Sequence, residues 1–355
     1  MDVQDLDQKR MTQAVPLLLD WFSHNARILP WRADQEPYHV WLSEIMLQQT
    51  RVEAVKGYYA RFLAALPTIA DLAQAPEEQI LKLWEGLGYY NRVRNLQKAA
   101  QEIMTRFEGV FPRQYEDILS LPGIGAYTAG AISSICFGEP RPAVDGNVLR
   151  VIARLLCFSD SVDQPASKRL MTELLAAEYP VGHCGAFTQS LMELGALVCI
   201  PNGAPHCEVC PVAACCLARE RDCAAALPVR DAKRARRKEQ HTVFLLLCGD
   251  AVAVCRRPAK GLLRGLWEFP NVQGLLTPEA AIRQAEAWGV RPAELLQSVS
   301  RTHVFTHVEW EMTGYYLRCA ARDPQFLWAD TEKLTGEIAL PTAFRLFWPE
   351  LQGYL

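Results

Sequence analysis

The helical spacing of apolar side chains from residue 11 to about residue 220 constrains the fold of this 355-residue chain more than any other feature. Segments such as "YHVWLSEIMLQQT" and "NVLRVIARLLC" place apolar residues three and four positions apart, which is the period of an amphipathic helix. Glycine and proline separate these segments, as at "GLGYY" and "GEPRP". We therefore expect an all-α domain here, without a run of alternating strands.

The pattern changes after residue 240. "HTVFLLLCGDAVAVCRRP" predicts two strands around a Gly-Asp turn, "PEAAIRQAEAWGV" predicts a helix and "HVEWEMTGYYLRCA" predicts a further strand. Between the two parts, "RDAKRARRKEQ" carries six basic and two acidic side chains, and it is either a solvated linker or a phosphate contact. The predicted organisation is a helical domain over residues 1–228, a basic linker over 229–240 and an α+β domain over 241–355.

Neither a membrane segment nor a secretory signal is expected. Apolar runs such as Val243 to Cys248 fall far short of the ~20 residues that cross a bilayer, and the start "MDVQDLDQKR" is polar and acidic. We expect a cytoplasmic location, no membrane partner and a monomer. The net charge of −3 argues only weakly against nucleic acid, because the distribution of charge matters more than its total.

The stretch "LPGIGAYTAG", residues 121–130, contains a Gly-x-Gly turn ahead of a predicted helix. A dinucleotide fingerprint would need a buried strand before it and a third glycine where Thr128 stands. A helix, a tight turn and a second helix instead predict a helix-hairpin-helix. Gly123 and Gly125 allow a positive φ and a close approach, and the free N–H groups of the second helix can bind a DNA phosphate. An ordinary helix–helix turn is the alternative.

Six of the twelve cysteines crowd into 25 residues near the end of the helical part. In a cytosolic chain this indicates a metal or cluster site rather than a disulfide framework. A zinc ribbon would show two CxxC pairs, whereas one pair, Cys207 and Cys210, with the single cysteines Cys199 and Cys216 suits an iron–sulfur cubane. Cys215 has a less suitable spacing as the fourth ligand. Buried cysteines without a cofactor are the alternative.

The order of these parts resembles a known superfamily. A hairpin, an acid fifteen residues after Gly130 (Asp145) and a cysteine cluster resemble the helix-hairpin-helix DNA glycosylases, which include endonuclease III, over roughly residues 15–220. "WLSEIMLQQT", "LPWR", "GLGYYNR" and "LPGIGAYTAGAI" resemble the MutY-type adenine glycosylases, which remove adenine opposite 8-oxoguanine. The resemblance implies double-stranded DNA with A:8-oxoG or A:G mispairs as the substrate. It also implies a [4Fe–4S] cluster in the loop 199–216, with a first gap one residue longer than the family pattern, held by Cys199, Cys207, Cys210 and Cys216.

The resemblance also implies catalytic roles. Glu44, a carboxylate in an otherwise apolar helix, would protonate adenine N7, and Asp145 would stabilise the oxocarbenium-like sugar. An acid that reaches water and a simple helix N-cap are the respective alternatives. Tyr127 and Asn147 would support this site. Bifunctional relatives have a lysine where Tyr127 stands, and a phenol cannot form a Schiff base, so we expect base removal without strand cleavage.

The remaining implied contacts form two groups. The adenine pocket would be lined by Arg27, Trp31, Arg32, Leu47 and Gln189. DNA and 8-oxoguanine would be contacted by Gln49, Thr50, Leu87, Gly88, Tyr89, Gly123, Gly125, Phe305, Thr306 and His307. Tyr89 would fill the stack that the flipped adenine leaves. Ordinary core aromatics are the alternative for Trp31 and Tyr89, and a solvent-facing histidine is the alternative for His307.

The C-terminal part resembles the Nudix-like domain of the same family through "RRPAKGLLRGLWEFPNVQG". Its predicted helix "IRQAEAWGV" lacks the paired glutamates that bind Mg²⁺ in Nudix hydrolases, so no pyrophosphohydrolase activity is expected. Phe305-Thr306-His307 matches the family's Phe-Ser-His recognition loop with threonine in place of serine. Both residues carry a hydroxyl donor.

Two other functions compete with this interpretation. A helix-hairpin-helix glycosylase/lyase for oxidised pyrimidines is opposed by Tyr127 and by the C-terminal domain. A non-catalytic protein that binds damaged DNA is opposed by the pair of Glu44 and Asp145.

Overall fold

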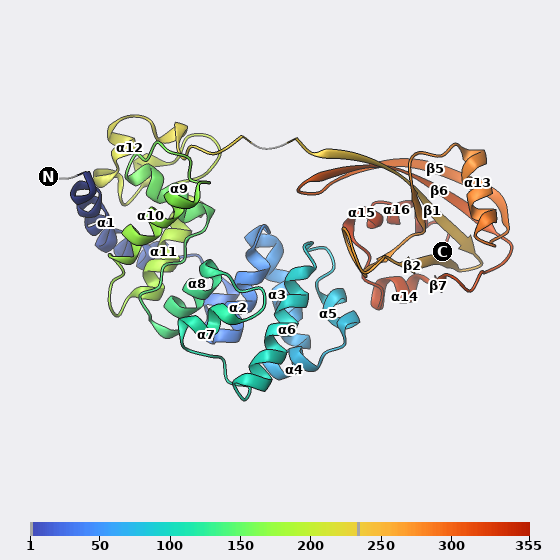
Figure 1. Ribbon diagram of the computed structural model, residues 1–355, viewed down its shortest axis with the longest axis horizontal. Coiled ribbons are helices and arrows are strands. Elements are labelled where there is room, and N and C mark those ends of the chain that lie inside the picture. The colour runs from blue at the N-terminus through green and yellow to red at the C-terminus, as the bar shows by residue number, and fades with distance from the viewer. Residues whose placement is uncertain (1–2, 233–234) are drawn as a thin grey trace. The chain divides into compact units, whose positions relative to one another are not determined.

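The computed structural model describes residues 3–232 and 235–355, which form two compact units (Figure 1). The units comprise Met1–Gln74 with Asn95–Ala232, and Ala75–Arg94 with Lys233–Leu355. The segment 75–94 therefore groups with the C-terminal part of the chain, although the sequence places it inside the predicted domain over 1–228.

The expected all-α character of the first part is confirmed, because the described residues up to 232 form helices and no strand. The α-helices are α1(Val3–Asn25), α2(Pro37–Leu47), α3(Val52–Ala65), α4(Ile69–Gln74), α5(Glu77–Leu83), α6(Asn91–Arg106), α7(Tyr115–Ser120), α8(Ala126–Phe137), α9(Gly146–Leu155), α10(Pro165–Ala176), α11(Cys184–Leu197) and α12(Leu217–Glu220). A 3-10 turn, η1(Pro30–Arg32), follows α1.

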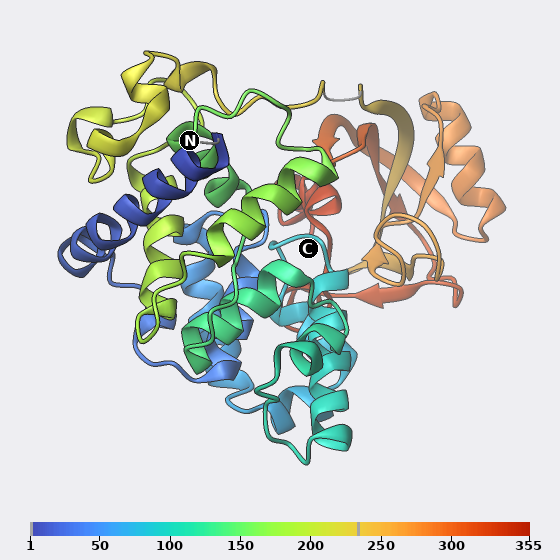
Figure 2. The same cartoon turned by 60° about the vertical axis from the view of Figure 1, so that its left-hand side comes forward.

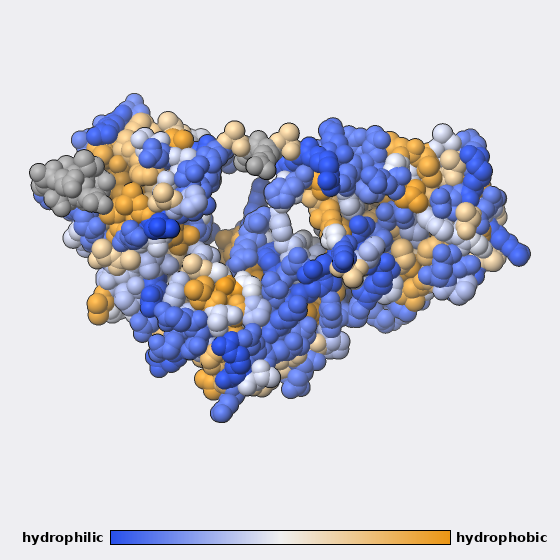
Figure 3. All heavy atoms as spheres, viewed as in Figure 1, coloured by the Kyte–Doolittle hydropathy of each residue, from blue (hydrophilic) through white to orange (hydrophobic). Residues whose placement is uncertain are grey.

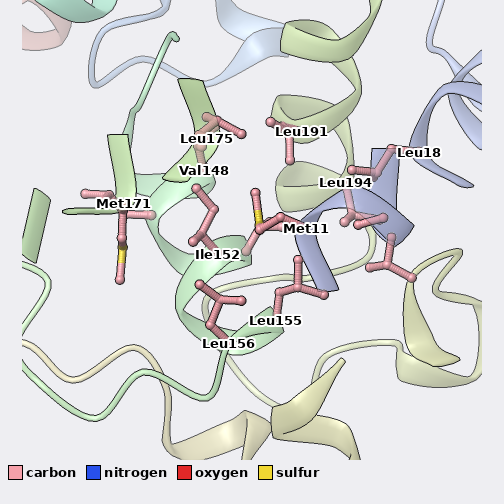
Figure 4. Close-up of a cluster of buried hydrophobic side chains, with 14 of the residues drawn as sticks. Met11, Leu18, Val148, Ile152, Leu155, Leu156, Met171, Leu175, Leu191 and Leu194 are labelled. Atoms are coloured by element: carbon pink, nitrogen blue, oxygen red, sulfur yellow. The ribbon is translucent and has the colours of Figure 1, made fainter. Parts of the chain in front are cut away.

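A hydrophobic core holds α9 in place in the first unit. Met11 and Leu18 of α1, Ile152 of α9, Leu175 of α10 and Leu191 of α11 are almost completely buried in one cluster (Figure 4). The views in Figure 1 and Figure 2 both show α1, α9, α10 and α11 packed together. Burial of the apolar face of α9 among three other helices fixes its position, and therefore fixes the position of the residues at its N-terminus.

The second unit contains a seven-stranded mixed sheet with the strand order β3-β2-β1-β6-β5, in which β4 also pairs with β1 and β7 with β2. The strands are β1(Arg237–Cys248), β2(Ala251–Arg256), β3(Trp267–Glu268), β4(Asn271–Gln273), β5(Pro292–Val304), β6(Val308–Cys319) and β7(Leu327–Ala329). β1 and β6 are parallel, and the other pairs are antiparallel.

Helices cover both faces of this sheet. Phe244 and Leu246 of β1 pack with Ala281 and Ala285 of α13(Pro278–Ala287). The alternate residues of β1 pack in a second cluster with α14(Thr331–Gly336), α15(Thr342–Arg345) and α16(Trp348–Leu351). Because side chains alternate along a strand, β1 is apolar on both faces and lies at the centre of the unit.

The predicted strands at 241–258 and 307–320 and the helix at 278–290 are confirmed by β1, β2, β6 and α13. The Gly-Asp turn is present, with Cys248 paired to Ala251 across it and Gly249 at φ 65°. β1 begins at Arg237, within the segment 229–240 that was predicted to be a linker. The strand extends this far because its polar first residues pair with β6 through backbone hydrogen bonds. Such pairing needs no apolar side chain.

None of the helices formed by the described residues is long and apolar enough to span a bilayer. In the space-filling view, hydrophilic residues cover most of the visible face, and hydrophobic residues show in separate smaller patches (Figure 3).

Candidate active site

A cavity of about 530 Å³ in the first unit gathers residues that lie far apart in the sequence. This volume is in the range of pockets that hold small ligands. Its walls include eleven of the residues predicted from the sequence, namely Arg27, Trp31, Arg32, Glu44, Leu47, Gln49, Thr50, Tyr127, Asp145, Asn147 and Gln189. They come from η1, α2, α8, α11 and the start of α9, and from the loops that precede η1 (Arg27) and follow α2 (Gln49 and Thr50). The fold therefore brings the two predicted carboxylates to one cavity.

Glu44 is a buried carboxylic acid at the edge of this cavity. Glu44 is only 6% exposed to solvent, and the Tyr127 hydroxyl donates a hydrogen bond of 2.6 Å to its Oε2. Burial raises the pKa of Glu44 to about 7; the hydrogen bond from Tyr127 opposes this rise, whereas the charge of Asp145 adds to it. Glu44 is therefore close to half protonated at neutral pH, which suits a general acid.

Asp145 is the N-cap of α9. Its Oδ1 accepts hydrogen bonds from the backbone N–H groups of Asn147 at 2.9 Å and Val148 at 2.8 Å, and its Oδ2 accepts one from Asn147 Nδ2 at 2.8 Å. The positive end of the helix dipole lies at the same place and favours a negative charge. The carboxylate is thus held in one orientation, as an anion that stabilises a nearby cation must be.

Glycines let the helices around this site approach closely. A Cβ on Gly130 of α8 would lie 2.0 Å from the carbonyl oxygen of Pro142, in the loop that leads to Asp145. A Cβ on Gly195 of α11 would lie 2.8 Å from Cβ of Asn147. Contacts this short leave no room for a side chain, so these glycines set the position of the Asp145 loop.

Gly130→Ala is expected to destabilise the protein by about 1–3 kcal/mol, because backbone atoms must move to admit the methyl group. Gly336→Ala, at the last residue of α14, is the control, since Gly336 is also helical and its Cβ would meet nothing within 4 Å. Denaturant unfolding should show a lower midpoint for Gly130→Ala alone. Equal stability of the two variants would contradict the packing argument.

Glu193 is a site residue that the sequence analysis missed. It is completely buried in α11, and its two oxygens accept from Arg27 (Nε 2.8 Å, Nη2 2.8 Å) and Arg32 (Nη2 2.9 Å). Burial favours a higher pKa for Glu193, but the hydrogen bonds from the two arginines outweigh it and lower this pKa to about 2. Glu193 stays charged and fixes both arginines at the cavity wall. Its signal was the same as that of Glu44: an acid in an apolar helix segment, "QSLMELGALV".

Arg150 of α9, also missed, connects the Asp145 site to the cysteine-rich loop. Its Nη2 donates to Asn147 Oδ1 at 2.9 Å and to the Gly195 carbonyl at 2.7 Å, and its Nε donates to the Cys199 carbonyl at 2.8 Å. Asn147 in turn donates to Asp145. This chain of hydrogen bonds orients Asn147, and the order of the cysteine loop therefore supports the carboxylate.

The cysteine-rich loop forms a second, largely apolar cavity. The four predicted ligands line it, namely Cys199, Cys207, Cys210 and Cys216. Cys215 does not line it, and its Sγ instead donates to the Val212 carbonyl at 3.3 Å. Arg154 Nη1 donates to Cys199 Sγ at 3.3 Å, so the cavity also supplies a positive charge next to sulfur. This arrangement fits an anionic sulfur-ligated group.

No three His, Cys, Asp or Glu side chains among the described residues are grouped closely enough to hold a metal ion. What supports a sulfur-ligated group here is the single cavity that all four cysteines line, together with the guanidinium of Arg154 beside Cys199.

The predicted hairpin is formed by α7, the Gly-x-Gly turn and α8. Gly123 has φ 78°, and a Cβ there would lie 2.6 Å from Cβ of Asn95, so the turn requires glycine at this position. The expectation of positive φ at Gly125 is wrong, because its φ is −102°. Gly125 is instead the N-cap of α8 without a side-chain hydrogen bond, so no side chain there competes with a phosphate for the first N–H groups.

The other predicted DNA contacts lie in the second unit. Tyr89 is 47% exposed, and its hydroxyl is 2.6 Å from the hydroxyl of Thr306. Thr306 and His307 are exposed in the turn between β5 and β6. The Phe305 ring instead packs on Trp310, with 4.9 Å between the two ring centroids. The side chain of Leu87 is buried, and Gly88 has φ 70° beside it.

Comparisons with known proteins agree with both units. Residues 42–177 match the HhH-GPD superfamily of base excision DNA repair proteins, and residues 242–350 match the NUDIX domain. The adenine DNA glycosylase of Arabidopsis thaliana is 36% identical over 366 residues, which cover 86% of this chain but only 57% of that protein. The chain thus spans less than two thirds of that relative.

Two further comparisons cover more of the known protein. The adenine DNA glycosylase of Rattus norvegicus is 32% identical over 394 residues, which cover 95% of this chain and 74% of that protein. The solved structure of a thermostable thymine-DNA glycosylase superposes with a TM-score of 0.55 at 29% identity, covering 60% of this chain and 98% of that one. This chain therefore belongs to the adenine DNA glycosylase family, in the HhH-GPD superfamily of base excision DNA repair proteins.

Proposed function

We propose that this enzyme removes adenine paired with 8-oxoguanine, or with guanine, from double-stranded DNA and leaves the strand intact. The observation that carries the proposal is the pair of carboxylates in one cavity. Glu44 is buried with a pKa of about 7, and Asp145 is held by three hydrogen bonds at a helix N-terminus. An acid and an anion in different environments are what the cleavage of a glycosidic bond requires.

In the proposed reaction, Glu44 supplies a proton and Asp145 supplies a negative charge. Glu44 donates its proton to adenine N7, the bond between C1′ and N9 breaks, and its electron pair leaves with the base. Asp145 stabilises the positive charge that develops on the sugar. A water molecule then adds to C1′ and gives a proton to the Glu44 carboxylate. Tyr127 holds Glu44, and Asn147 holds Asp145.

The same cavity supplies the contacts for the flipped base. Trp31 and Leu47 provide apolar surface, and the amide of Gln189 can match the donor and acceptor edge of adenine. Arg27 and Arg32 are fixed by Glu193 and cannot rotate freely toward other bases. We propose that this rigidity contributes to the choice of adenine.

Recognition of the opposite strand is assigned to residues of the first unit and, separately, to residues of the second unit, most of which are exposed. Gly123 and Gly125 present the start of α8 to a phosphate. Gln49, Thr50, Tyr89 and the loop 305–307 contact 8-oxoguanine and fill the vacated stack, with Leu87 and Gly88 placing Tyr89. The exposed hydroxyl of Thr306 and the half-exposed ring of Tyr89 support these roles.

The test uses duplexes with A:8-oxoG, A:G or thymine glycol, analysed with and without hot alkali. Cleavage of the adenine strand only after alkali supports base removal without lyase activity. Cleavage without alkali, or activity on thymine glycol alone, would favour a glycosylase/lyase for oxidised pyrimidines. Binding without any product would indicate a damage-binding protein.

The rate of base release should depend on pH through Glu44. Because the protonated acid is required, the single-turnover rate should fall about tenfold per pH unit above the pKa of Glu44, about 7, and level off just below it. Tyr127→Phe removes a hydrogen bond that lowers the pKa of Glu44, so the midpoint of this fall should move to higher pH. An unchanged or lower midpoint in Tyr127→Phe would contradict the assignment.

We also propose that Cys199, Cys207, Cys210 and Cys216 hold a [4Fe–4S] cluster, which would order the loop and supply no step of the reaction. Purified protein should contain about four iron atoms and four sulfides per chain. Cys207→Ser should lose most of this iron, whereas Cys215→Ser should keep it because Cys215 lies outside the cavity. Zinc in place of iron, or iron loss only in Cys215→Ser, would refute the ligand set. The cytoplasmic location and the monomeric state stay predictions from the sequence.

A further inference from the structure

Two cysteines outside the proposed cluster site lie close together near the C-terminal end of α9. The sulfurs of Cys157 and Cys223 are 3.1 Å apart although the residues are 66 positions apart in the sequence, and both side chains are partly exposed. We propose that this pair is a peroxide-sensitive modification site that forms a reversible disulfide. Neither residue lines the cysteine cavity, so the pair is separate from the proposed ligands.

Different elements fix the two thiols in this position. Cys157 follows α9, where it has φ 50° and its N–H donates to the Arg154 carbonyl at 3.2 Å. Cys223 follows α12, and its N–H donates to the Ala218 carbonyl at 2.8 Å. Arg154 Nε also donates to the Leu227 carbonyl at 2.9 Å, which ties the chain after Cys223 to α9. A shift of about 1 Å would bring the sulfurs to bonding distance.

The chemistry balances with hydrogen peroxide as the oxidant. One thiolate attacks a peroxide oxygen, the O–O bond breaks and hydroxide leaves, giving a sulfenic acid. The second thiol attacks that sulfur, the S–O bond breaks, the S–S bond forms and water leaves. Two electrons pass from the sulfurs to the peroxide. The hydrogen bond with Cys157 raises the pKa of Cys223, which opposes formation of its thiolate, so Cys223 is assigned the role of the second thiol.

The disulfide would close a segment of the chain that contains the loop of the proposed cluster. All four cavity cysteines lie between Cys157 and Cys223 in the sequence, and the disulfide would join the segment that follows α12 to the end of α9. We infer that the oxidised chain keeps this loop on α9 when iron is removed. This consequence rests on the proposed cluster, whereas the disulfide itself does not.

The test uses the full-length protein treated with hydrogen peroxide, alkylated and digested with trypsin without reduction. Residues 155–168 and 222–230 are tryptic peptides with one cysteine each, so a disulfide appears as their linked pair, two hydrogens lighter than their sum. The pair should vanish after dithiothreitol and in Cys157→Ser and Cys223→Ser. Cys136→Ser, a partly buried cysteine on α8, is the matched control and should keep it.

The proposal fails if peroxide converts either residue to sulfinic acid without linked peptides, or links either one to a different cysteine. Iron content and base release are measured on the same samples. A linked pair in protein that contains no iron would sustain the disulfide and refute only the cluster. For the loop, trypsin cleavage after Arg219 and Arg221 in iron-depleted protein should be several-fold slower in the oxidised form. Equal rates would refute the effect on the loop.

Discussion

Glu44→Gln is expected to lower the single-turnover rate of adenine release by roughly 10³-fold, within the range for loss of a general acid. Glutamine has the same shape as glutamate, and its carbonyl oxygen can still accept the hydrogen bond from Tyr127. It cannot transfer a proton to adenine N7. Binding of A:8-oxoG duplex should therefore remain within a fewfold of that of the natural protein, so that base release and binding separate.

Glu36→Gln is the control for this experiment. Glu36 is an exposed acid at the start of the same helix, and its loss should change neither base release nor binding. If Glu44→Gln keeps more than about a tenth of the natural rate, the role of general acid must pass to another group. If it loses binding as well, Glu44 is needed for the shape of the cavity rather than for proton transfer.

Asp145→Asn is expected to lower the rate of base release by about 10²–10³-fold while the protein keeps its stability, because removal of one preorganised charge or dipole typically has an effect of this size. Asparagine is as good an N-cap as aspartate, so the backbone hydrogen bonds to residues 147 and 148 can persist. What disappears is the negative charge that faces the developing cation. Single-turnover kinetics and denaturant unfolding measure the two properties separately.

Asp145→Ala makes this separation stricter. Alanine removes both the charge and the cap, so it should lose activity like Asp145→Asn and also about 1 kcal/mol of stability. A role as a cap alone predicts the opposite result, in which Asp145→Asn keeps its activity and only Asp145→Ala is impaired. The two variants therefore distinguish the catalytic interpretation from the structural one.

The two carboxylates need different kinds of support. Glu44 gains its raised pKa mainly from burial, which depends on the packing of α2 against its neighbours. Asp145 depends on local hydrogen bonds within three residues and on the position of α9, which the core in Figure 4 and the glycine at 130 set. Changes at distant core positions should therefore affect Asp145 through geometry and Glu44 through solvent access.

Local sequence patterns were sufficient to predict much of the architecture. The period of apolar residues identified most helices up to residue 220, and alternation with a Gly-Asp turn identified β1 and β2. β5 was not recognised, because its side chains are exposed or half-buried and its apolar residues do not alternate with polar ones. The grouping of residues 75–94 with the C-terminal unit was not predicted either, since contacts between distant segments leave no local pattern.

The sequence by itself determined the features that depend on neighbouring residues. These are the helical first part, the hairpin turn at Gly123, the capping position of Asp145 and the spacing of the four cysteines. Only the tertiary structure decided which distant groups meet: the ion pairs of Glu193 with Arg27 and Arg32, the pKa of Glu44, and the contact between Cys157 and Cys223. The physical reason is that burial and charge pairing act through space, whereas helix period, turn conformation and capping act along the chain.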